Sequence, residues 1–364
     1  MRSFLPRMAA MLCATLLAAP TFAEEAQVNV YNWSDYIAKD TVSNFEKEGH
    51  IRVKYDVFDT DETLQAKLLS GRAGYDVVVP SSTFMAKQIE AGVYMKLDKS
   101  KLPNLMHLDP VLMKIVATMD PHNQYGVPYA WGTTGMGINV TKLQKALGKD
   151  VPLDSFDIVF KPEYLSRINC GVSMLDSPTD VFPLVLKYIG KDPNSKNQAD
   201  YHAAYETLKK LRPYITQFNS SGYINDLANG DICLAIGYSG DVNIARNRAH
   251  EARKPYELRY QMVKGNTPIW FDLMGIPKDS NHPEAAHKWI NYILRPDVSA
   301  SITNEVFYPT ANVSAKKMTK PEIVNDQNVY PTEAQLKSMY VELPLPSDLT
   351  RLMNRLWSEY KSGR

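Results

Sequence analysis

Residues 76–80 read Asp-Val-Val-Val-Pro, and this stretch decides the fold class. Its apolar residues follow one another without alternation, which is typical of a strand buried on both faces of a parallel sheet. Two further strands are expected over residues 28–33 and 51–58, with helices over 40–49, 61–70 and 83–91. Because strands and helices alternate along the chain, the sequence predicts a doubly wound α/β lobe.

A second α/β pattern follows residues 128–137, a stretch rich in glycine and threonine that suits an extended crossover between two lobes. The expected division places residues 27–134 and 265–308 in lobe 1, and residues 135–264 and 309–364 in lobe 2. The final segment, residues 333–361, is expected to be largely helical and to brace lobe 2. Ligands of open α/β sheets bind where the carboxyl ends of strands meet, so the predicted site is the cleft between the lobes.

Residues 1–23 have the pattern of a secretory signal. Arg2 and Arg7 give a positive start, a short apolar run follows, and Thr21-Phe-Ala23 offers small residues at the cleavage positions. The apolar run is too short to anchor the chain in a bilayer. The sequence therefore predicts cleavage after Ala23 and export of a free, soluble protein.

The charge balance of the exported chain is close to neutral. Residues 1–23 hold two arginines and no acidic residue, so their removal changes the formal net charge from +1 to −1. Proteins that bind nucleic acid need a basic face, which this balance does not favour. We therefore expect no nucleic-acid partner.

Two cysteines remain after cleavage, Cys170 and Cys233. In an oxidising compartment an isolated pair usually closes as a disulfide. A metal or redox role is the alternative, but the chain has no Cys-x-x-Cys, and His282 and His287 miss the spacing of two ligands on one helix face. We expect neither a metal site nor a cofactor.

Residues 237–241, Gly-Tyr-Ser-Gly-Asp, follow a predicted strand and raise the hypothesis of a catalytic serine. A nucleophile elbow needs Gly-x-Ser-x-Gly, and here the last glycine is missing. Asp272 with His282 or His287 would have to complete a triad with Ser239. A periplasmic serine hydrolase stays open as the alternative of another class.

Aromatic and acidic residues recur together at the predicted strand ends. Ring faces attract ammonium groups and cover methylenes, and carboxylates accept charge-assisted hydrogen bonds, so this pairing suits an organic cation. Taken singly, each aromatic residue is consistent with core packing and each aspartate with a helix cap. The residues at these ends include Trp33, Asp35, Tyr36, Asp180, Tyr238, Asp241, Trp270, Asp272 and Tyr308.

The chain resembles the bacterial periplasmic polyamine-binding proteins, the solute receptors of spermidine/putrescine ABC importers. The resemblance covers essentially the whole exported chain and is most specific at residues 31–37, 55–59, 223–233, 237–241 and 294–298. It implies two α/β lobes, of the type II periplasmic-binding-protein kind, that close on the ligand. It also implies a Cys170–Cys233 disulfide, a periplasmic location, docking on a membrane permease and no catalysis. We expect a monomer.

The resemblance also assigns ligand contacts. Asp241 and Asp272 would hold protonated amines, with Asp272 the most important, and Asp35 and Asp180 would serve the terminal amines directly or through water. Ser34 and Ser81 would hydrogen-bond near one end, and Ser239 would have no role. The expected aromatic box consists of Trp33, Tyr36, Tyr238, Trp270 and Tyr308.

The pair Tyr238 and Trp270 resembles the branch of the family that prefers spermidine, and the short side chain of Asp180 leaves room for a longer ligand or a water. We therefore expect spermidine first and putrescine next, although a pocket discriminates one methylene by only about 1–3 kcal/mol. A receptor for another small organic cation or an ω-amino acid is the narrower alternative. A carboxylate-bearing ligand would need a basic partner, and no Arg or Lys is among the predicted contacts. A sensory or structural binder also stays open.

Overall fold

The computed structural model describes residues 26–363, and the predicted signal at residues 1–23 lies outside them. In this part of the chain ten strands form one mixed sheet, in the order β2-β1-β3-β9-β4-β7-β5-β6, with β10 beside β9 and β8 beside β4. The strands are β1 Gln27–Trp33, β2 Arg52–Phe58, β3 Val77–Val78, β4 Gly126–Asn139, β5 Val172–Met174, β6 Gln217–Phe218, β7 Leu234–Tyr238, β8 Leu258–Gln261, β9 Pro268–Gly275 and β10 Tyr340–Val341.

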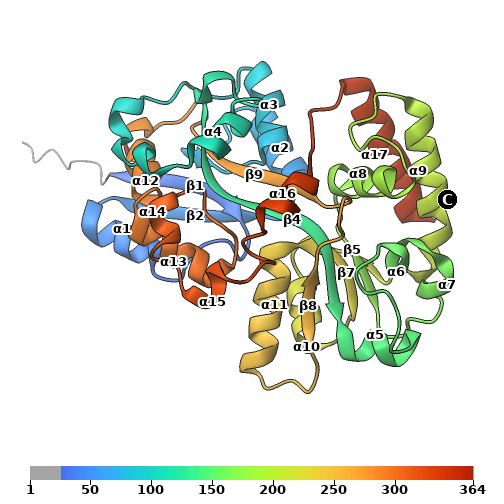
Figure 1. Ribbon diagram of the computed structural model, residues 1–364. Helices are drawn as coiled ribbons and strands as arrows, with labels where there is room; N and C mark the ends of the chain where they lie inside the picture. Colours follow the sequence, from blue (N-terminus) through green and yellow to red (C-terminus); the bar gives the residue numbers. More distant parts are fainter. Residues whose placement is uncertain (1–25, 364) are drawn as a thin grey trace, which may run out of the picture.

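The helices cover this sheet in two groups, so that the protein has two lobes (Figure 1). The first group consists of α1 Thr41–Gly49, α2 Asp61–Leu69, α3 Ser82–Glu90, α4 Pro110–Val116, α12 Pro283–Ile293, α13 Pro296–Val306, α14 Val313–Lys316 and α15 Pro321–Val324. The second consists of α5 Val140–Leu147, α6 Asp157–Phe160, α7 Pro162–Leu165, α8 Pro178–Tyr188, α9 Gln198–Leu211, α10 Tyr223–Asn229, α11 Ser239–Glu251 and α17 Ser347–Ser362. Helix α16 Glu333–Ser338 lies between the two groups, and short 3-10 turns lie at η1 Lys99–Lys101, η2 Pro103–His107, η3 Pro121–Asn123 and η4 Arg212–Tyr214.

The stretch at residues 76–80 is a short, buried strand, as predicted. β3 spans only Val77–Val78, because Pro80 cannot donate to a sheet and the helix α3 begins two residues later. β1 lies between β3 and β2 and is parallel to both. This arrangement confirms the α/β class and brings the carboxyl end of β1 beside that of β3.

The extended crossover is also confirmed. β4 is a single strand of fourteen buried residues. Its first half pairs with β9, from Gly126 to Thr133, and its second half pairs with β7 and β8, from Thr134 to Asn139. One continuous strand therefore connects the sheets of the two lobes, with β9 and β7 on either side of the point where it passes between them.

The C-terminal segment is largely helical, as expected, but a strand separates its two helices. After α16 the chain forms β10, which adds to β9, and only at Ser347 does α17 begin. Residues 343–346 read Leu-Pro-Leu-Pro, and proline both lacks the amide donor and disfavours a helical residue before it. α17 packs on α9 and α8, whereas α14 packs on α13 and η2. The division of the chain between the lobes stays a prediction.

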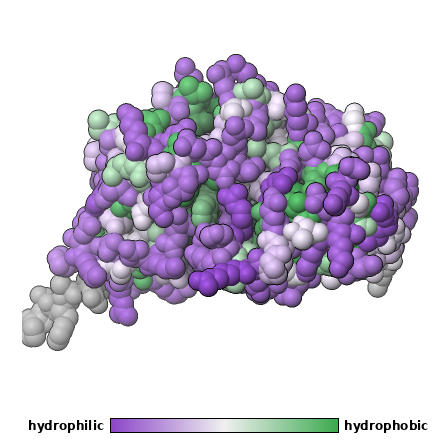
Figure 2. Space-filling view, turned by 60° about the horizontal axis from the view of Figure 1, so that its bottom comes forward, coloured by the Kyte–Doolittle hydropathy of each residue, from purple (hydrophilic) through white to green (hydrophobic). Residues whose placement is uncertain are grey.

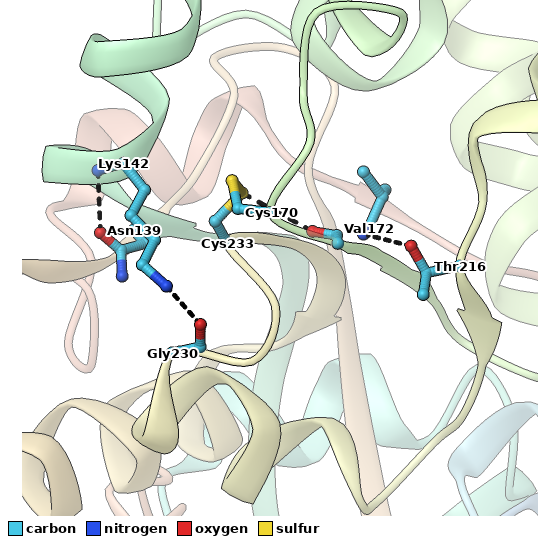
Figure 3. The surroundings of a disulfide bond; sticks show 8 residues. Asn139, Lys142, Cys170, Val172, Thr216, Gly230 and Cys233 are labelled. Carbon is cyan, nitrogen blue, oxygen red and sulfur yellow. Dashed lines mark hydrogen bonds between the residues drawn. A yellow bond between two sulfur atoms is a disulfide. The ribbon is translucent and has the colours of Figure 1, made fainter.

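The predicted disulfide joins Cys170 to Cys233, with Cα atoms 5.6 Å apart (Figure 3). It links the segment before β5 to the start of β7, two neighbouring parallel strands. A loop of 63 residues predicts a stabilisation of about 4 kcal/mol in the chain-entropy account. The bond thus fixes the strand whose far end carries Tyr238.

The surface is mostly hydrophilic with small, separated apolar areas (Figure 2). Among residues 26–363, no helix combines the length and the apolar character that a membrane span requires.

Candidate functional site

A cavity of about 80 Å³ lies between the lobes, at the carboxyl ends of β1 and β7 and beside β9. The structure brings ten of the eleven predicted contact residues to its wall. They are Trp33, Ser34, Tyr36, Ser81, Asp180, Tyr238, Asp241, Trp270, Asp272 and Tyr308. Their role as ligand contacts stays a prediction.

Asp272 and Asp241 form the inner acidic end of the cavity. Asp272 lies on β9 and accepts a hydrogen bond of 2.7 Å from Tyr36 Oη, while Asp241, on the first turn of α11, accepts bonds from Tyr308 Oη at 2.6 Å and Tyr223 Oη at 2.9 Å. Burial raises the pKa of Asp272 well above its usual range. Burial likewise raises the pKa of Asp241 to about 7, against the opposing effect of its tyrosine partners. Two carboxyl groups with no basic partner are thus held ready for a cation.

The rings of the predicted box pack edge to face around this end. Tyr36 meets Tyr308 with ring centroids 4.7 Å apart, and Trp270 lies 5.7 Å from both Tyr308 and Tyr238. Such T-shaped and tilted pairs favour a fixed set of ring positions. Trp270 Nε1 donates to Thr134 Oγ1 at 3.1 Å, which fixes the indole plane.

Two glycines make room for these rings. A Cβ atom at Gly240 would lie 2.1 Å from Tyr308 Cε2, and one at Gly132 would lie 2.6 Å from Trp270. Gly240 of the Gly-Tyr-Ser-Gly stretch therefore makes room for a ring of the cavity wall. This is a steric reason for a pattern that had also suggested a nucleophile elbow.

Trp33, Ser34 and Ser81 complete the wall on the side of the first lobe. Trp33 Nε1 donates to the carbonyl of Val79 at 2.8 Å, and Ser34 Oγ donates to Asp59 at 3.1 Å. Ser81 caps α3 and forms a bridge with Asp272 between the adjacent chain segments. Backbone pairing therefore holds one serine beside the inner acidic end.

Asp180 is a further acidic residue of the cavity wall, carried by the second lobe, and we call it the outer acidic end. It lies in the first turn of α8 and accepts a hydrogen bond of 3.0 Å from Tyr238 Oη. Burial raises the pKa of Asp180, in spite of its hydrogen bonds from Ser177 and Tyr238. Tyr238 thus supplies both an aromatic ring and a hydrogen-bond donor to Asp180. Tyr36 and Tyr308 do the same for Asp272 and Asp241.

Four charged residues of the wall were missed by the sequence analysis: Asp59, Asp61, Lys87 and Glu342. Burial raises the pKa of Asp61 to about 8, and burial followed by the charges of Asp180 and Asp61 raises the pKa of Glu342 well above its usual range. Lys87 Nζ donates to Thr350 Oγ1 at 3.1 Å, and burial lowers its pKa. A basic residue therefore does line the cavity, contrary to expectation. Neither an apolar stripe nor a helix-cap motif in the sequence points to these residues.

Asp35 is the predicted contact that does not line the cavity. Its backbone adopts φ 51°, and its carboxylate pairs with Arg248 of α11 at 2.5 Å. Both side chains are about 37% exposed, so the pair lies at the rim. The turn directs Asp35 away from its neighbours Ser34 and Tyr36.

The serine-hydrolase alternative lacks its histidine. Ser239 is buried, and its Oγ accepts a hydrogen bond from Thr133 N at 3.4 Å. His282 contacts Asp76 instead, and His287 contacts Asp98 and Pro283. Among residues 26–363, no group of three or more His, Cys, Asp or Glu side chains is arranged to hold a metal ion.

Comparison with known proteins places the chain in a family. The profile of the bacterial extracellular solute-binding proteins matches residues 40–331. The chain belongs to this family. Within it the chain is 46% identical to the putrescine-binding periplasmic protein SpuD of Pseudomonas aeruginosa, over 98% of each chain, and 48% identical to the putrescine-binding periplasmic protein PotF of Escherichia coli, over 94% of this chain and 93% of that one.

Relatives of lower identity have names that include both spermidine and putrescine. The spermidine/putrescine-binding periplasmic protein of Salmonella typhimurium is 33% identical over 97% of this chain and 98% of its own. A solved structure titled as a putative spermidine/putrescine ABC transporter from Listeria monocytogenes superposes with a TM-score of 0.83, at 31% identity, over 93% of this chain and 99% of that one. These relatives confirm the two-lobe fold and the resemblance to periplasmic polyamine-binding proteins of ABC importers.

The family decides two further expectations. The solute-binding protein is a periplasmic receptor rather than an enzyme, because its relatives are binding proteins of transport systems. The more similar relatives are named for putrescine, whereas the names that include spermidine belong to relatives of lower identity. This order favours putrescine over spermidine, against the expectation drawn from Tyr238 and Trp270.

Proposed function

We propose that this receptor captures putrescine in the periplasm and delivers it to an ABC permease, after removal of residues 1–23 as a signal. The observation that carries the proposal is a cavity whose wall combines three buried aspartates with aromatic rings. Asp241 and Asp272 would hold one ammonium group and Asp180 the other, through charge-assisted hydrogen bonds. The rings between them would cover the methylene chain and attract the adjacent charges.

The size of the cavity supports a short diamine. A water-sized position needs roughly 10–15 Å³, so a cavity of about 80 Å³ has about five to eight such positions. Putrescine has about six non-hydrogen atoms in a line, whereas spermidine has about ten, and tight enclosure of the ligand is usual for such sites. Spermidine would require the lobes to sit further apart.

Capture would follow from closure of the lobes on the ligand. Two contacts already join segments of the first lobe to segments of the second: Asp35 with Arg248, and Glu62 with Thr179 at 2.9 Å. A ligand that bridges Asp272 on β9 and Asp180 on α8 favours the state in which these segments meet. The permease would then recognise the closed form.

The test is calorimetric titration of the ligand-free exported chain with putrescine, spermidine, cadaverine and γ-aminobutyrate. We expect tight one-to-one binding of putrescine, weaker binding of spermidine and none of γ-aminobutyrate, whose carboxylate would face the acidic wall. Asp272→Asn should weaken putrescine binding by at least about 100-fold, because a buried ammonium would lose its charged partner. If none of the amines gives a binding signal, the proposal is refuted.

A further inference from the structure

The segment between β10 and α17 forms part of the cavity wall. β10 pairs in parallel with β9, the strand that carries Trp270 and Asp272, and the next residue, Glu342, lines the cavity. Leu343 and Leu345 line it as well. A segment at the far end of the sequence therefore lies beside the ligand site.

Asn194 holds this segment in place from the second lobe. Its side chain donates to the carbonyl of Val341 at 3.0 Å and accepts from the amide of Leu343 at 2.8 Å. The residue between these two bonds is Glu342, whose carbonyl also accepts from Thr83 Oγ1 at 3.5 Å. Since the backbone is fixed on both sides of Glu342, the position of its carboxyl group is restricted.

That carboxyl group has no partner that would explain its burial. Within residues 26–363, Glu342 Oε1 is buried and makes no hydrogen bond, and Tyr340 Oη, two residues earlier, is in the same condition. The charges of Asp180 and Asp61 act on Glu342, so its nearest charged neighbours have the same sign. A buried, unpaired carboxylate costs free energy, and the molecule avoids this cost when the group takes up a proton or when a cation is supplied.

Lys87 does not supply that cation. Its ammonium group donates to Thr350, and the acidic groups that act on it are Glu90 and Glu62. In the described part of the chain, no salt bridge includes Glu342, Asp61 or Asp180. These three carboxyl groups line the cavity without an internal counter-ion among the described residues; Asp61 accepts from Ser81 N at 3.0 Å and so lies beside Asp272.

We propose that Glu342, acting with Asp180, is a specificity-determining ligand group for the outer ammonium of a diamine. This inference rests on the proposed capture of a diamine and adds to it a group that is carried by the C-terminal segment and held by Asn194. The receptor thereby selects ligands that are cationic at both ends. A monoamine of the same length fills the inner end and the ring channel but leaves Glu342 without a partner.

The experiment compares Glu342→Gln with the wild-type protein on two ligands, putrescine and 1-aminobutane, the second by displacement of putrescine if its direct titration is too weak. The amide keeps the shape of the side chain and removes its charge. Putrescine affinity should fall by about 10- to 100-fold, the range of a charge-assisted hydrogen bond, whereas the affinity for 1-aminobutane should change by less than about 2-fold. The ligand-free variant should unfold at the same temperature as the wild type or above it, because an unpaired buried charge has been removed.

Glu333→Gln is the matched control. Glu333 lies in the same C-terminal segment, but its side chain is 83% exposed and pairs with Lys337. This variant removes the same charge and should bind both ligands as the wild type does. Equal losses for putrescine and 1-aminobutane in Glu342→Gln, or no loss for either, would overturn the inference. If the wild type binds no diamine, the proposed function fails as well, so the two failures are distinguishable.

Asn194→Ala tests how the segment is held. Asn194 acts through Glu342 as a positioning residue, so its substitution should weaken putrescine binding in the wild type and add little in the Glu342→Gln background. The selectivity for putrescine over 1-aminobutane should fall in parallel. A loss of the same size in both backgrounds would contradict this coupling.

Discussion

Three of the carboxyl groups that line the proposed diamine channel are each held by a tyrosine whose ring forms part of the channel wall. Tyr36 holds Asp272, Tyr308 holds Asp241, and Tyr238 holds Asp180. One residue type thus supplies an apolar surface for methylenes and fixes the carboxylate beside it. The arrangement also keeps these groups buried, and their pKa values are raised for that reason.

The raised pKa values predict that putrescine binding releases protons. Burial raises the pKa of Asp241 to about 7 and that of Asp61 to about 8. Below these values an arriving ammonium group must displace a proton, so affinity should fall as the pH is lowered from 8 to 6, by at most about tenfold per unit for each proton displaced. Calorimetry in buffers of different ionisation enthalpy measures the protons released, and a pH-independent affinity would contradict the prediction.

The same groups give the ligand-free protein the opposite dependence. An acid whose pKa is raised on folding binds more protons in the folded state between the unfolded value, near 4, and the folded one, so stability declines as the pH rises through that window. The rise in melting temperature that saturating putrescine causes should therefore be larger at pH 8 than at pH 6. Differential scanning fluorimetry at the two pH values checks the sign.

At the residue scale, the sequence predicted the inner end of the site better than the outer end. Asp241, Asp272 and the surrounding aromatic residues follow predicted strands, where side chains converge for reasons of topology. Asp35 has the same sequence signal, yet a positive φ turns it toward Arg248. Glu342 had no such signal. Its place depends on a tail that returns to β9 from 72 positions further along the chain, since Val341 pairs with Ile269 (341 − 269 = 72).

At the element scale, the close packing of α11 against the aromatic box makes a prediction about Gly240. A methyl group there would overlap the ring of Tyr308, whose hydroxyl holds Asp241. Gly240→Ala should therefore lower the free energy of unfolding by about 1–3 kcal/mol, the usual cost of overpacking, and weaken putrescine binding as well. Alanine would otherwise favour a helix, so a gain in stability would mean that Tyr308 moves without cost.

Gly49→Ala is the control for that substitution. Gly49 is the last residue of the helix α1, and a Cβ atom there would meet side-chain atoms only at 3.8 Å or more. Thermal unfolding of both variants, with and without putrescine, separates a helix-propensity effect from a ring displacement. Only Gly240→Ala should lose part of the ligand-induced rise in melting temperature.

The helices and strands could be predicted where their pattern of residues lies within one short stretch of the sequence. The strands of the first lobe and the crossover β4 follow from runs of apolar, branched or glycine-rich residues, and the structure confirms them. The C-terminal segment is largely helical, as expected, and Pro344 and Pro346 lie in the break between α16 and α17. Those prolines were the available signal, and the break they impose is what allows residues 340–345 to reach the cavity.

At the scale of the whole molecule, Asp272 and Asp180 belong to different lobes, so a ligand held by both couples its affinity to lobe closure. Asp272 lies on β9 beside the first-lobe strand β3, and Asp180 lies on α8, which packs on α9 and α17. Contacts that join the lobes without touching the ligand should change the lifetime of the complex. Asp35–Arg248 is such a contact, because it lies at the rim and connects the end of β1 with α11.

We expect Arg248→Ala to raise the dissociation rate of putrescine by less than about tenfold, since exposed ion pairs contribute about 0–1 kcal/mol. Arg259→Ala is the control, because Arg259 pairs with Glu257 of its own lobe at similar exposure and should leave the rate unchanged. Stopped-flow fluorescence of Trp33 and Trp270, which both line the cavity, measures the rate directly. The difference in dissociation rate between Arg248→Ala and the wild type should shrink as salt is added, because screening weakens the ion pair in the wild type. Equal dissociation rates for the two arginine variants would show that this ion pair has no part in holding the lobes closed.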